Sequence, residues 1–276
     1  MPAVEVDDPT DARIAAFMGL RDHDLRRLRE AAGGDMDGLF VAEGAVVSGR
    51  ALAAGYRARA VLVDRSRADP LPAGLDVGVP VYRAGPRVIA AVTGYQSHRG
   101  ALVAFARLPL PGPGEVLADA SRVIVTEAVV NPTNLGVIVR SAAAFGFEAL
   151  LLDPRSCDPL YRRANRASMG EGFAVPHART DSLPGGLEPL LRAGFTVVAL
   201  TPATDAVELG AFATGIGDED RLALVLGSEG PGLTPATEAA VDVRVRIALA
   251  GRVDSLNVGV AAGIACYALG RRPRPT

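Results

Sequence analysis

The sequence predicts an α/β protein, with a C-terminal domain built on a parallel sheet and a smaller α/β domain before it. From about residue 120 onward, short β-branched apolar runs alternate with helical patterns, which is typical of a parallel sheet covered on both faces. A shorter alternation of the same kind occupies residues 38–108. Five of the next six residues, 109–114, are proline or glycine. Such a stretch predicts a linker between domains.

The first domain is expected to follow a helical N-terminal extension over residues 1–37. Ile14, Phe17 and Leu25 can share one apolar stripe of a helix, and two glycines at 33 and 34 end that helix. Within the first domain, 38–108, strands are expected at 39–41, 60–63, 80–82 and 101–105, and helices at 44–54 and 86–92.

The larger domain is expected to span residues 120–272, after a linker over 109–119. Its apolar strand candidates cover 123–125, 149–152, 195–200, 222–226 and 243–249. Its helix candidates lie between them, at 134–145, 160–168, 183–192, 234–240 and 257–269.

Composition limits the class of protein. The 276 residues are 49% hydrophobic and 22% charged, which indicates a globular, soluble protein with a large core. No apolar run reaches the roughly 18–20 residues of a membrane helix, and no secretory signal is visible, so we expect a cytoplasmic protein with no membrane partner. Cys157 and Cys266 lack CxxC or His-rich neighbours. They are expected to be ordinary thiols, and no metal site is predicted.

Charge is distributed unevenly although the net charge is only −2. Every basic residue other than histidine is arginine, and residues 40–109 hold nine arginines against four acidic residues. A second arginine cluster contains Arg155, Arg162, Arg163 and Arg166. Local basic surfaces of this kind favour phosphate contacts. A solvated charged face is the alternative.

Three polar segments follow predicted strands of the larger domain. In residues 131–147, Asn134 stands at an expected helix N-cap, and Arg140 is the one long polar side chain of that helix. Residues 227–233 combine three glycines with Glu229 at the end of a strand, where open α/β sheets bind ligands. In residues 251–257, Ser255 or Asn257 caps the last helix. Neither GxGxxG nor a P-loop is present. Plain caps and a tight turn are the structural alternatives.

Taken together, the three segments resemble a known family. Asn134-x-Gly136-x-x-x-Arg140-Ser141-Ala142, residues 226–233 and Ser255-Leu256-Asn257-Val258-x-Val260-Ala261 are similar, in order and spacing, to the three motifs of the SpoU/TrmH-type SPOUT RNA 2′-O-methyltransferases. The resemblance covers about residues 120–270. Residues 38–107 resemble the small SpoU substrate-binding domain, with Gly94-x-x-x-His98-x-Gly100 as its closing motif and Arg99 where Gln is more usual.

The resemblance implies methyl transfer from S-adenosylmethionine to a ribose 2′-hydroxyl of rRNA or tRNA, with rRNA favoured. It also implies a deep trefoil knot and a homodimer whose partner helps to build the active site. The implied catalytic residues are Arg140, Asn134, Glu229, Ser255 and Asn257. The implied cofactor-binding residues are Leu200, Thr201, Gly227, Ser228, Glu229, Gly230, Ile247, Leu249, Gly251, Ser255, Leu256 and Asn257. The RNA-binding candidates are Arg57, Arg59, Arg65, Arg67, His98, Arg99, Arg162, Arg163 and Arg166.

Several alternatives stay open. Arg140 is either the base for the 2′-hydroxyl, in an unusually desolvated site, or a clamp on the target phosphate, because guanidinium groups are normally protonated. Residues 247–250 are Ile-Ala-Leu-Ala where Ile-Pro-Met is commoner, which affects pocket packing. His23 and His177 are expected to be structural or at the surface. The rival functions are a catalytically inactive RNA-binding relative and an unrelated nucleotide-dependent α/β enzyme.

Overall fold

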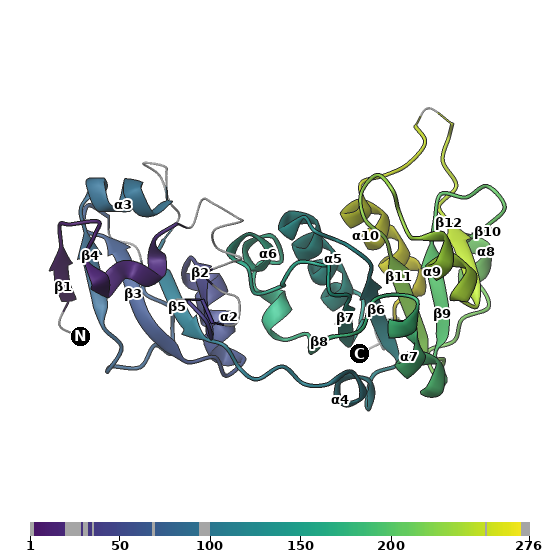
Figure 1. Cartoon of the computed structure of the whole chain (residues 1–276), viewed down its shortest axis with the longest axis horizontal. Helices are drawn as coiled ribbons and strands as arrows, with labels where there is room; N and C mark the ends of the chain where they lie inside the picture. The colour runs from purple at the N-terminus through teal and green to yellow at the C-terminus, as the bar shows by residue number, and fades with distance from the viewer. Residues whose placement is uncertain are drawn as a thin grey trace, which may run out of the picture. The chain divides into compact units, whose positions relative to one another are not determined.

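The computed structural model describes residues 3–19, 29, 33–34, 36–67, 70–93, 100–251 and 253–271. The chain divides into two compact units (Figure 1). The first unit contains Met1–Pro109 together with Leu160–Ala174, and the second contains Leu110–Pro159 together with Val175–Thr276. Each unit has its own sheet and its own core.

The second unit is built on a seven-stranded sheet in which every pairing is parallel. The strand order is β10-β12-β9-β11-β6-β7-β8. The strands are β6 (Arg122–Thr126), β7 (Ala149–Leu152), β8 (His177–Arg179), β9 (Thr196–Leu200), β10 (Val207–Glu208), β11 (Leu222–Leu226) and β12 (Val243–Arg246). The predicted parallel sheet is therefore confirmed.

The strand sequences explain why this sheet is covered on both faces. All residues of β6, β7 and β11 are buried, and successive side chains of a strand point to opposite faces. Val123 and Val125 of β6 share a core with α4 (Pro113–Leu117) and α7 (Glu188–Arg192). Ile124 is equally buried and points to the opposite face, so helices are needed there too.

Helix α5 (Pro132–Ala144), which carries Asn134 and Arg140, packs against α10 (Val258–Leu269), which begins directly after Asn257 (Figure 1). Glycine allows their close approach, because a Cβ added to Gly259 of α10 would lie 3.0 Å from Val137 Cγ1 of α5. The shorter helices of this unit are α8 (Leu209–Ala213) and α9 (Pro235–Ala240). None of the helices in the described ranges is long and apolar enough to cross a membrane.

The first unit has a mixed five-stranded sheet in the order β1-β4-β3-β5-β2. Its apolar residues form one core on each face: one includes α2 and an aromatic cluster, and the other includes α3. The elements are β1 (Ala3–Val6), β2 (Leu39–Glu43), α2 (Ala45–Ala53), β3 (Ala58–Asp64), β4 (Val81–Ala84), α3 (Pro86–Thr93) and β5 (Leu102–Ala106).

The helical extension predicted over residues 1–37 is corrected at its start, where the chain forms a strand. Ala3–Val6 form an edge strand that pairs in parallel with β4, as its Ala-Val-Glu-Val sequence suits. Asp11 then accepts a hydrogen bond from the Arg13 amide at the start of a 3₁₀ helix, η1 (Ala12–Phe17). Ile14 and Phe17 are buried in the core of the first unit. Residues 20–28, which hold the rest of the predicted stripe, lie outside the described residues.

Residues 160–174 were expected in the larger domain, but they belong to the first unit. They leave the second unit after β7 and return before β8. Within them lies α6 (Arg162–Ala167). The Asn165 side chain donates to Val41 O of β2 at 3.1 Å, and the Phe173 ring lies 5.6 Å from the Phe40 ring. Residues 160–174 therefore belong to the first unit because of buried contacts with residues more than 100 positions away. The local sequence does not predict such contacts.

Other boundaries differ in smaller ways. The expected linker over 109–119 contains α4, whose Val116 and Leu117 are buried in the core of the second unit. Strand β12 ends at Arg246 rather than at residue 249. The helix expected at 183–192 is a 3₁₀ turn, Gly185–Leu187, followed by α7, because proline and glycine interrupt it. The short elements β8, β10 and α8 of the second unit were not predicted either.

Candidate active site

A pocket lies at the carboxyl ends of the neighbouring strands β9 and β11, together with the segment from residue 247 to the first turn of α10. Parallel α/β sheets bind ligands at this edge. Leucine and isoleucine side chains form much of the wall, while Glu229, serines and backbone groups add polar atoms. The lining residues are Leu200, Thr201, Pro202, Leu226, Gly227, Ser228, Glu229, Gly230, Gly232, Ile247, Leu249, Ser255, Leu256, Val258 and Ala261.

The loop over residues 227–233, here called the glycine loop, folds back on itself at the pocket. The Ser228 and Gly232 backbones exchange two hydrogen bonds of 3.2 Å each. A Cβ added to Gly227 would lie 2.4 Å from Gly232 C, so only glycine allows the two limbs to approach this closely. Gly230 has a φ of 82°, a left-handed conformation that favours glycine. The loop therefore presents backbone groups and Glu229 to the pocket.

Asn257 connects the three polar segments. Its Oδ1 accepts from the Gly259 amide at 2.9 Å and from the Val260 amide at 3.3 Å, so Asn257 is the N-cap of α10, as expected. Its Nδ2 donates to Asn134 Oδ1 at 3.1 Å and to Glu229 Oε1 at 2.6 Å. One amide thus joins the start of α5, the glycine loop and the start of α10.

Asn134 does not occupy the expected position. The N-cap of α5 is Asn131, whose side chain accepts from the Thr133 amide at 2.9 Å, because Pro132 occupies the first helical position. Asn134 lies in the first turn and is 7% exposed. Its Oδ1 is used by Asn257, and its buried Nδ2 has no hydrogen-bond partner in the described part of the chain. The buried donor is available to an acceptor of a ligand.

Arg140 is exposed on the second half of α5 and does not line the pocket. Its guanidinium makes no hydrogen bond or ion pair with the described residues, and is therefore available to an external anion. Ser255 is also exposed, and it does line the pocket. The structure thus joins Asn134, Glu229 and Asn257 by hydrogen bonds, but leaves Arg140 outside that group.

Ten of the twelve predicted cofactor-binding residues line the pocket; Gly251 and Asn257 do not. Five lining residues were not predicted: Pro202, Leu226, Gly232, Val258 and Ala261. Each is within four positions of a predicted residue. The strand ends indicated the correct segments, but only the folded chain shows which residues of a segment face the pocket.

The RNA-binding candidates separate into two groups. Arg57, Arg59 and Arg163 are exposed and make no hydrogen bond or ion pair within the described ranges. Arg65, by contrast, is paired with Asp7 at 2.6 Å. Arg162 and Arg166 are both paired with the buried Glu43, at 2.6 Å and 3.3 Å.

The structure says less about the three remaining RNA-binding candidates. Arg67 is exposed just after β3, whereas His98 and Arg99 lie outside the described residues. His177 is buried in β8. Among the residues that the structure describes, no three His, Cys, Asp or Glu side chains are grouped to hold a metal ion.

Comparison with known proteins identifies the class. Residues 121–267 match the model of the SpoU rRNA Methylase family. The chain is 40% identical over 264 residues to an uncharacterized tRNA/rRNA methyltransferase of Mycobacterium tuberculosis, covering 95% of this chain and 90% of that protein. It is 31% identical to the 23S rRNA (guanosine(2553)-2′-O)-methyltransferase RlmP of Bacillus subtilis, over 72% of this chain and 76% of the relative. The chain therefore belongs to the SpoU rRNA methylase family and is an RNA methyltransferase by family.

Solved structures agree with this assignment at the level of fold. The AdoMet-bound rRNA methyltransferase of Sinorhizobium meliloti superimposes with a TM-score of 0.77 over 97% of both chains, at 24% identity. The SpoU methyltransferase AviRb of Streptomyces viridochromogenes, in complex with AdoMet, gives a TM-score of 0.71 at 21% identity, covering 92% of this chain and 94% of that one.

Proposed function

We propose that this protein transfers a methyl group from S-adenosylmethionine to a ribose 2′-hydroxyl of RNA in the cytoplasm, with rRNA as the favoured substrate. The observation that carries the proposal is the pocket at the ends of β9 and β11, with the Asn134–Asn257–Glu229 group joined across three segments. The ribose 2′-oxygen and rRNA are supported by the similarity to RlmP, which is named for that chemistry.

The pocket residues fit S-adenosylmethionine. Apolar side chains such as Leu226, Ile247 and Leu256 suit the flat face of adenine. Backbone groups around Leu200 and Leu249 can bind its polar edge. The Glu229 carboxylate can face a cationic group, since a carboxylate favours a nearby positive charge.

When bound, S-adenosylmethionine would supply the methyl group to the ribose 2′-oxygen and leave as S-adenosylhomocysteine, while the 2′-hydroxyl proton passes to water. Most of the protein's contribution to such a displacement is positioning. Asn257 fixes Asn134 and Glu229 by hydrogen bonds, and Asn134 Nδ2 remains to donate to an RNA oxygen.

The exposure of Arg140 favours the clamp over the base. A guanidinium acts as a base only with strong desolvation, whereas an exposed one can form charge-assisted hydrogen bonds with a phosphate. Arg140 would thus hold the target phosphate, and its charge would make the neighbouring hydroxyl easier to deprotonate.

The proposal includes a homodimer and the knotted backbone that the resemblance implies. The dimer is supported by an exposed apolar stripe on α10, in which Val260, Ile264 and Tyr267 are 51%, 40% and 76% exposed. Residues spaced by three and four positions share one face of a helix. The knot is supported by the convergence on one pocket of segments near residues 200, 227 and 250, which are separated along the chain.

Two measurements test the proposed function. Calorimetric titration of the full chain with S-adenosylmethionine should give saturable, one-to-one binding. Mapping of 2′-O-methyl groups on total RNA should reveal a nucleotide that loses its methyl group when the gene is deleted. Absence of binding would exclude the enzyme. Binding with no change in the RNA map would leave the inactive relative as the better reading.

A further inference from the structure

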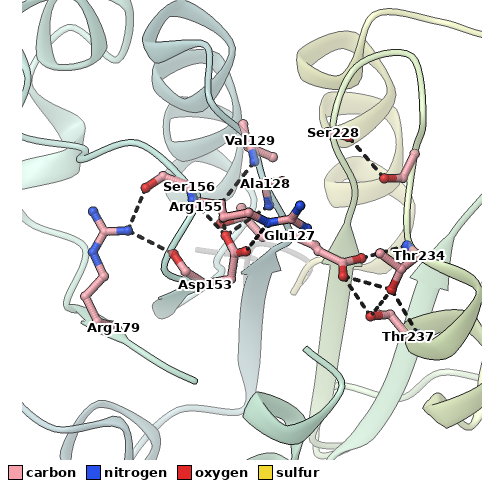
Figure 2. A network of polar contacts seen from close by, with 12 residues as sticks. Glu127, Ala128, Val129, Asp153, Arg155, Ser156, Arg179, Ser228, Thr234 and Thr237 are labelled. Atoms are coloured by element: carbon pink, nitrogen blue, oxygen red, sulfur yellow. Dashed lines mark hydrogen bonds and ion pairs between the residues drawn. The ribbon is translucent and has the colours of Figure 1, made fainter. Parts of the chain in front are cut away.

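Two buried carboxylates, Glu127 and Asp153, belong to a network of polar contacts and have no part in the proposed chemistry (Figure 2). Each is 2% exposed. Glu127 directly follows β6, and Asp153 directly follows β7. Both therefore lie at the edge of the sheet that holds the carboxyl ends of its strands, and Glu127 contacts Leu226, which lines the pocket.

Glu127 binds both ends of the glycine loop. Its backbone amide donates to Leu226 O, before the loop, at 2.9 Å. Its carboxylate accepts from the Thr234 amide at 2.9 Å, from the Thr234 hydroxyl at 3.0 Å and from the Thr237 hydroxyl at 3.0 Å, all after the loop. Figure 2 shows this carboxylate reaching from β6 to the two threonines.

Asp153 fixes the turn that follows Glu127 and leads into α5. Its Oδ1 accepts from the Ala128 amide at 2.9 Å and from the Ser156 hydroxyl at 2.6 Å, and that hydroxyl oxygen accepts from the Val129 amide at 3.1 Å. Ala128 has a φ of 54°, a left-handed conformation that is unfavourable for a residue with a side chain. The turn that leads into α5 is therefore held by side chains in a conformation it would not otherwise prefer.

Stability alone is a weak reason for the Glu127 network. The carboxylate has three hydrogen-bond donors, but no cationic partner within the described ranges. Burial of a charge is costly, and well-packed apolar groups of similar shape are often at least as stable. The network is better explained by the position in which it holds the segments that Glu127 joins.

We propose that Glu127 is a positioning residue that holds the glycine loop at the distance from β6 required to bind S-adenosylmethionine. This inference rests on the proposed function. Because Gly227 contacts the Gly232 backbone closely, and Thr234 follows that limb, a shift at Thr234 moves both limbs of the loop. Glu127 thus acts through the loop rather than on the ligand.

Paired variants at Thr237 provide the sharpest test, because Thr237 is fully buried in α9 and does not line the pocket. Thr237→Val keeps the shape and removes the hydroxyl, whereas Thr237→Ser keeps the hydroxyl. We expect the Kd for S-adenosylmethionine to rise about tenfold in Thr237→Val, as for one lost hydrogen bond to a charged group, and to change less than about threefold in Thr237→Ser. Amide hydrogen exchange of Ser228 and Gly232 without ligand should accelerate only in Thr237→Val.

Glu127→Gln should weaken binding further, because a neutral amide oxygen accepts from the Thr234 amide more weakly than a carboxylate does, and the new NH₂ group requires the Thr234 and Thr237 hydroxyls to turn from donating to accepting. Glu148→Gln is the matched control. Glu148 accepts from the Ser121 amide and hydroxyl at 2.7 Å and 3.0 Å, but at the opposite end of the sheet. We expect Glu148→Gln to lower the unfolding temperature and to leave the Kd unchanged.

Three results would overturn the inference: an unchanged Kd in Thr237→Val, an equal loss in Thr237→Ser, or an equal loss in Glu148→Gln. Failure of the unaltered chain to bind S-adenosylmethionine would overturn the proposed function itself. The exchange rates of the loop amides need no ligand and would still show whether the network holds the loop.

Discussion

Asn257 Nδ2 donates a hydrogen bond to Asn134 Oδ1 at 3.1 Å, between residues 123 positions apart in the chain. The helix cap determines the direction of this bond. Since Asn257 Oδ1 is used by the Gly259 and Val260 amides, only Nδ2 can face Asn134. Asn134 must then offer its oxygen to Asn257, and its own Nδ2 is left for a ligand. A capping interaction thereby orients a donor of the candidate active site.

Asn257→Asp should separate capping from orientation. An aspartate still caps α10 but cannot donate to Asn134, and it places a second carboxylate beside Glu229. We expect methyl transfer to fall at least about tenfold. Asn257→Ala should lose the cap as well, at about 1 kcal/mol of unfolding free energy. Turnover assays and chemical denaturation of both variants measure the two effects. Normal turnover in Asn257→Asp would show that the donor is not needed.

Arg140→Ala should abolish turnover without harming the fold. We expect methyl transfer to fall by at least about a hundredfold, while the Kd for S-adenosylmethionine stays the same. The free energy of unfolding should change by less than about 0.5 kcal/mol, because Arg140 is exposed and unpaired among the described residues. Arg140→Lys is the informative companion, since an ammonium keeps the charge and should retain part of the activity of a clamp. Near-normal turnover in Arg140→Ala would exclude both roles.

Combined substitution of the three free arginines, Arg57, Arg59 and Arg163, by alanine should weaken RNA binding. The dependence of log K on log salt should flatten by about 0.7 for each lost phosphate contact. Arg65→Ala is the control, because Arg65 is already paired with Asp7 and should contribute less. Filter binding at several salt concentrations measures the slope. A slope unchanged in the triple variant would place the RNA surface elsewhere.

Ile264→Asp should separate the proposed dimer. The change places a charge in the centre of the α10 stripe, at a side chain that is 40% exposed. Burial of an unpaired charge in an interface is strongly unfavourable, whereas the exposed monomer should tolerate it. Analytical ultracentrifugation should show a dimer for the unaltered chain and a monomer for the variant. Glu188→Ala, an exposed change on α7, provides the control.

The two cysteines should be unreactive in the native protein. Burial raises the pKa of Cys157 to about 12 and that of Cys266 to about 12, from an ordinary value near 9. At pH 8 a thiol reagent should label neither residue until the chain is unfolded, when it should label both. Because the folded pKa values are raised, the unfolded thiols ionise first. Stability should therefore be unaffected below about pH 9 and should fall as the pH rises toward 12. Rapid labelling of the native chain would contradict this burial.

The sequence by itself determined the parallel sheet and the location of the site. Continuous apolar runs such as 149–152 and 222–226 form strands with the predicted bounds, because strands buried on both faces require continuous apolar residues. Site segments were predictable for a related reason: glycine and polar residues directly after such strands lie at one edge of the sheet.

Only the tertiary structure decided which side chains meet there. It joined Asn134 to Asn257, assigned residues 160–174 to the first unit, paired Arg162 with Glu43 and left Arg163 without a partner among the described residues. It also placed Glu127 beneath the glycine loop, at Thr234, 107 positions along the chain. Local sequence patterns predict whether a residue lies in a strand, in a helix or at the solvent-exposed surface. Hydrogen bonds and ion pairs between distant residues depend on the packing of whole elements, and no local pattern carries that information.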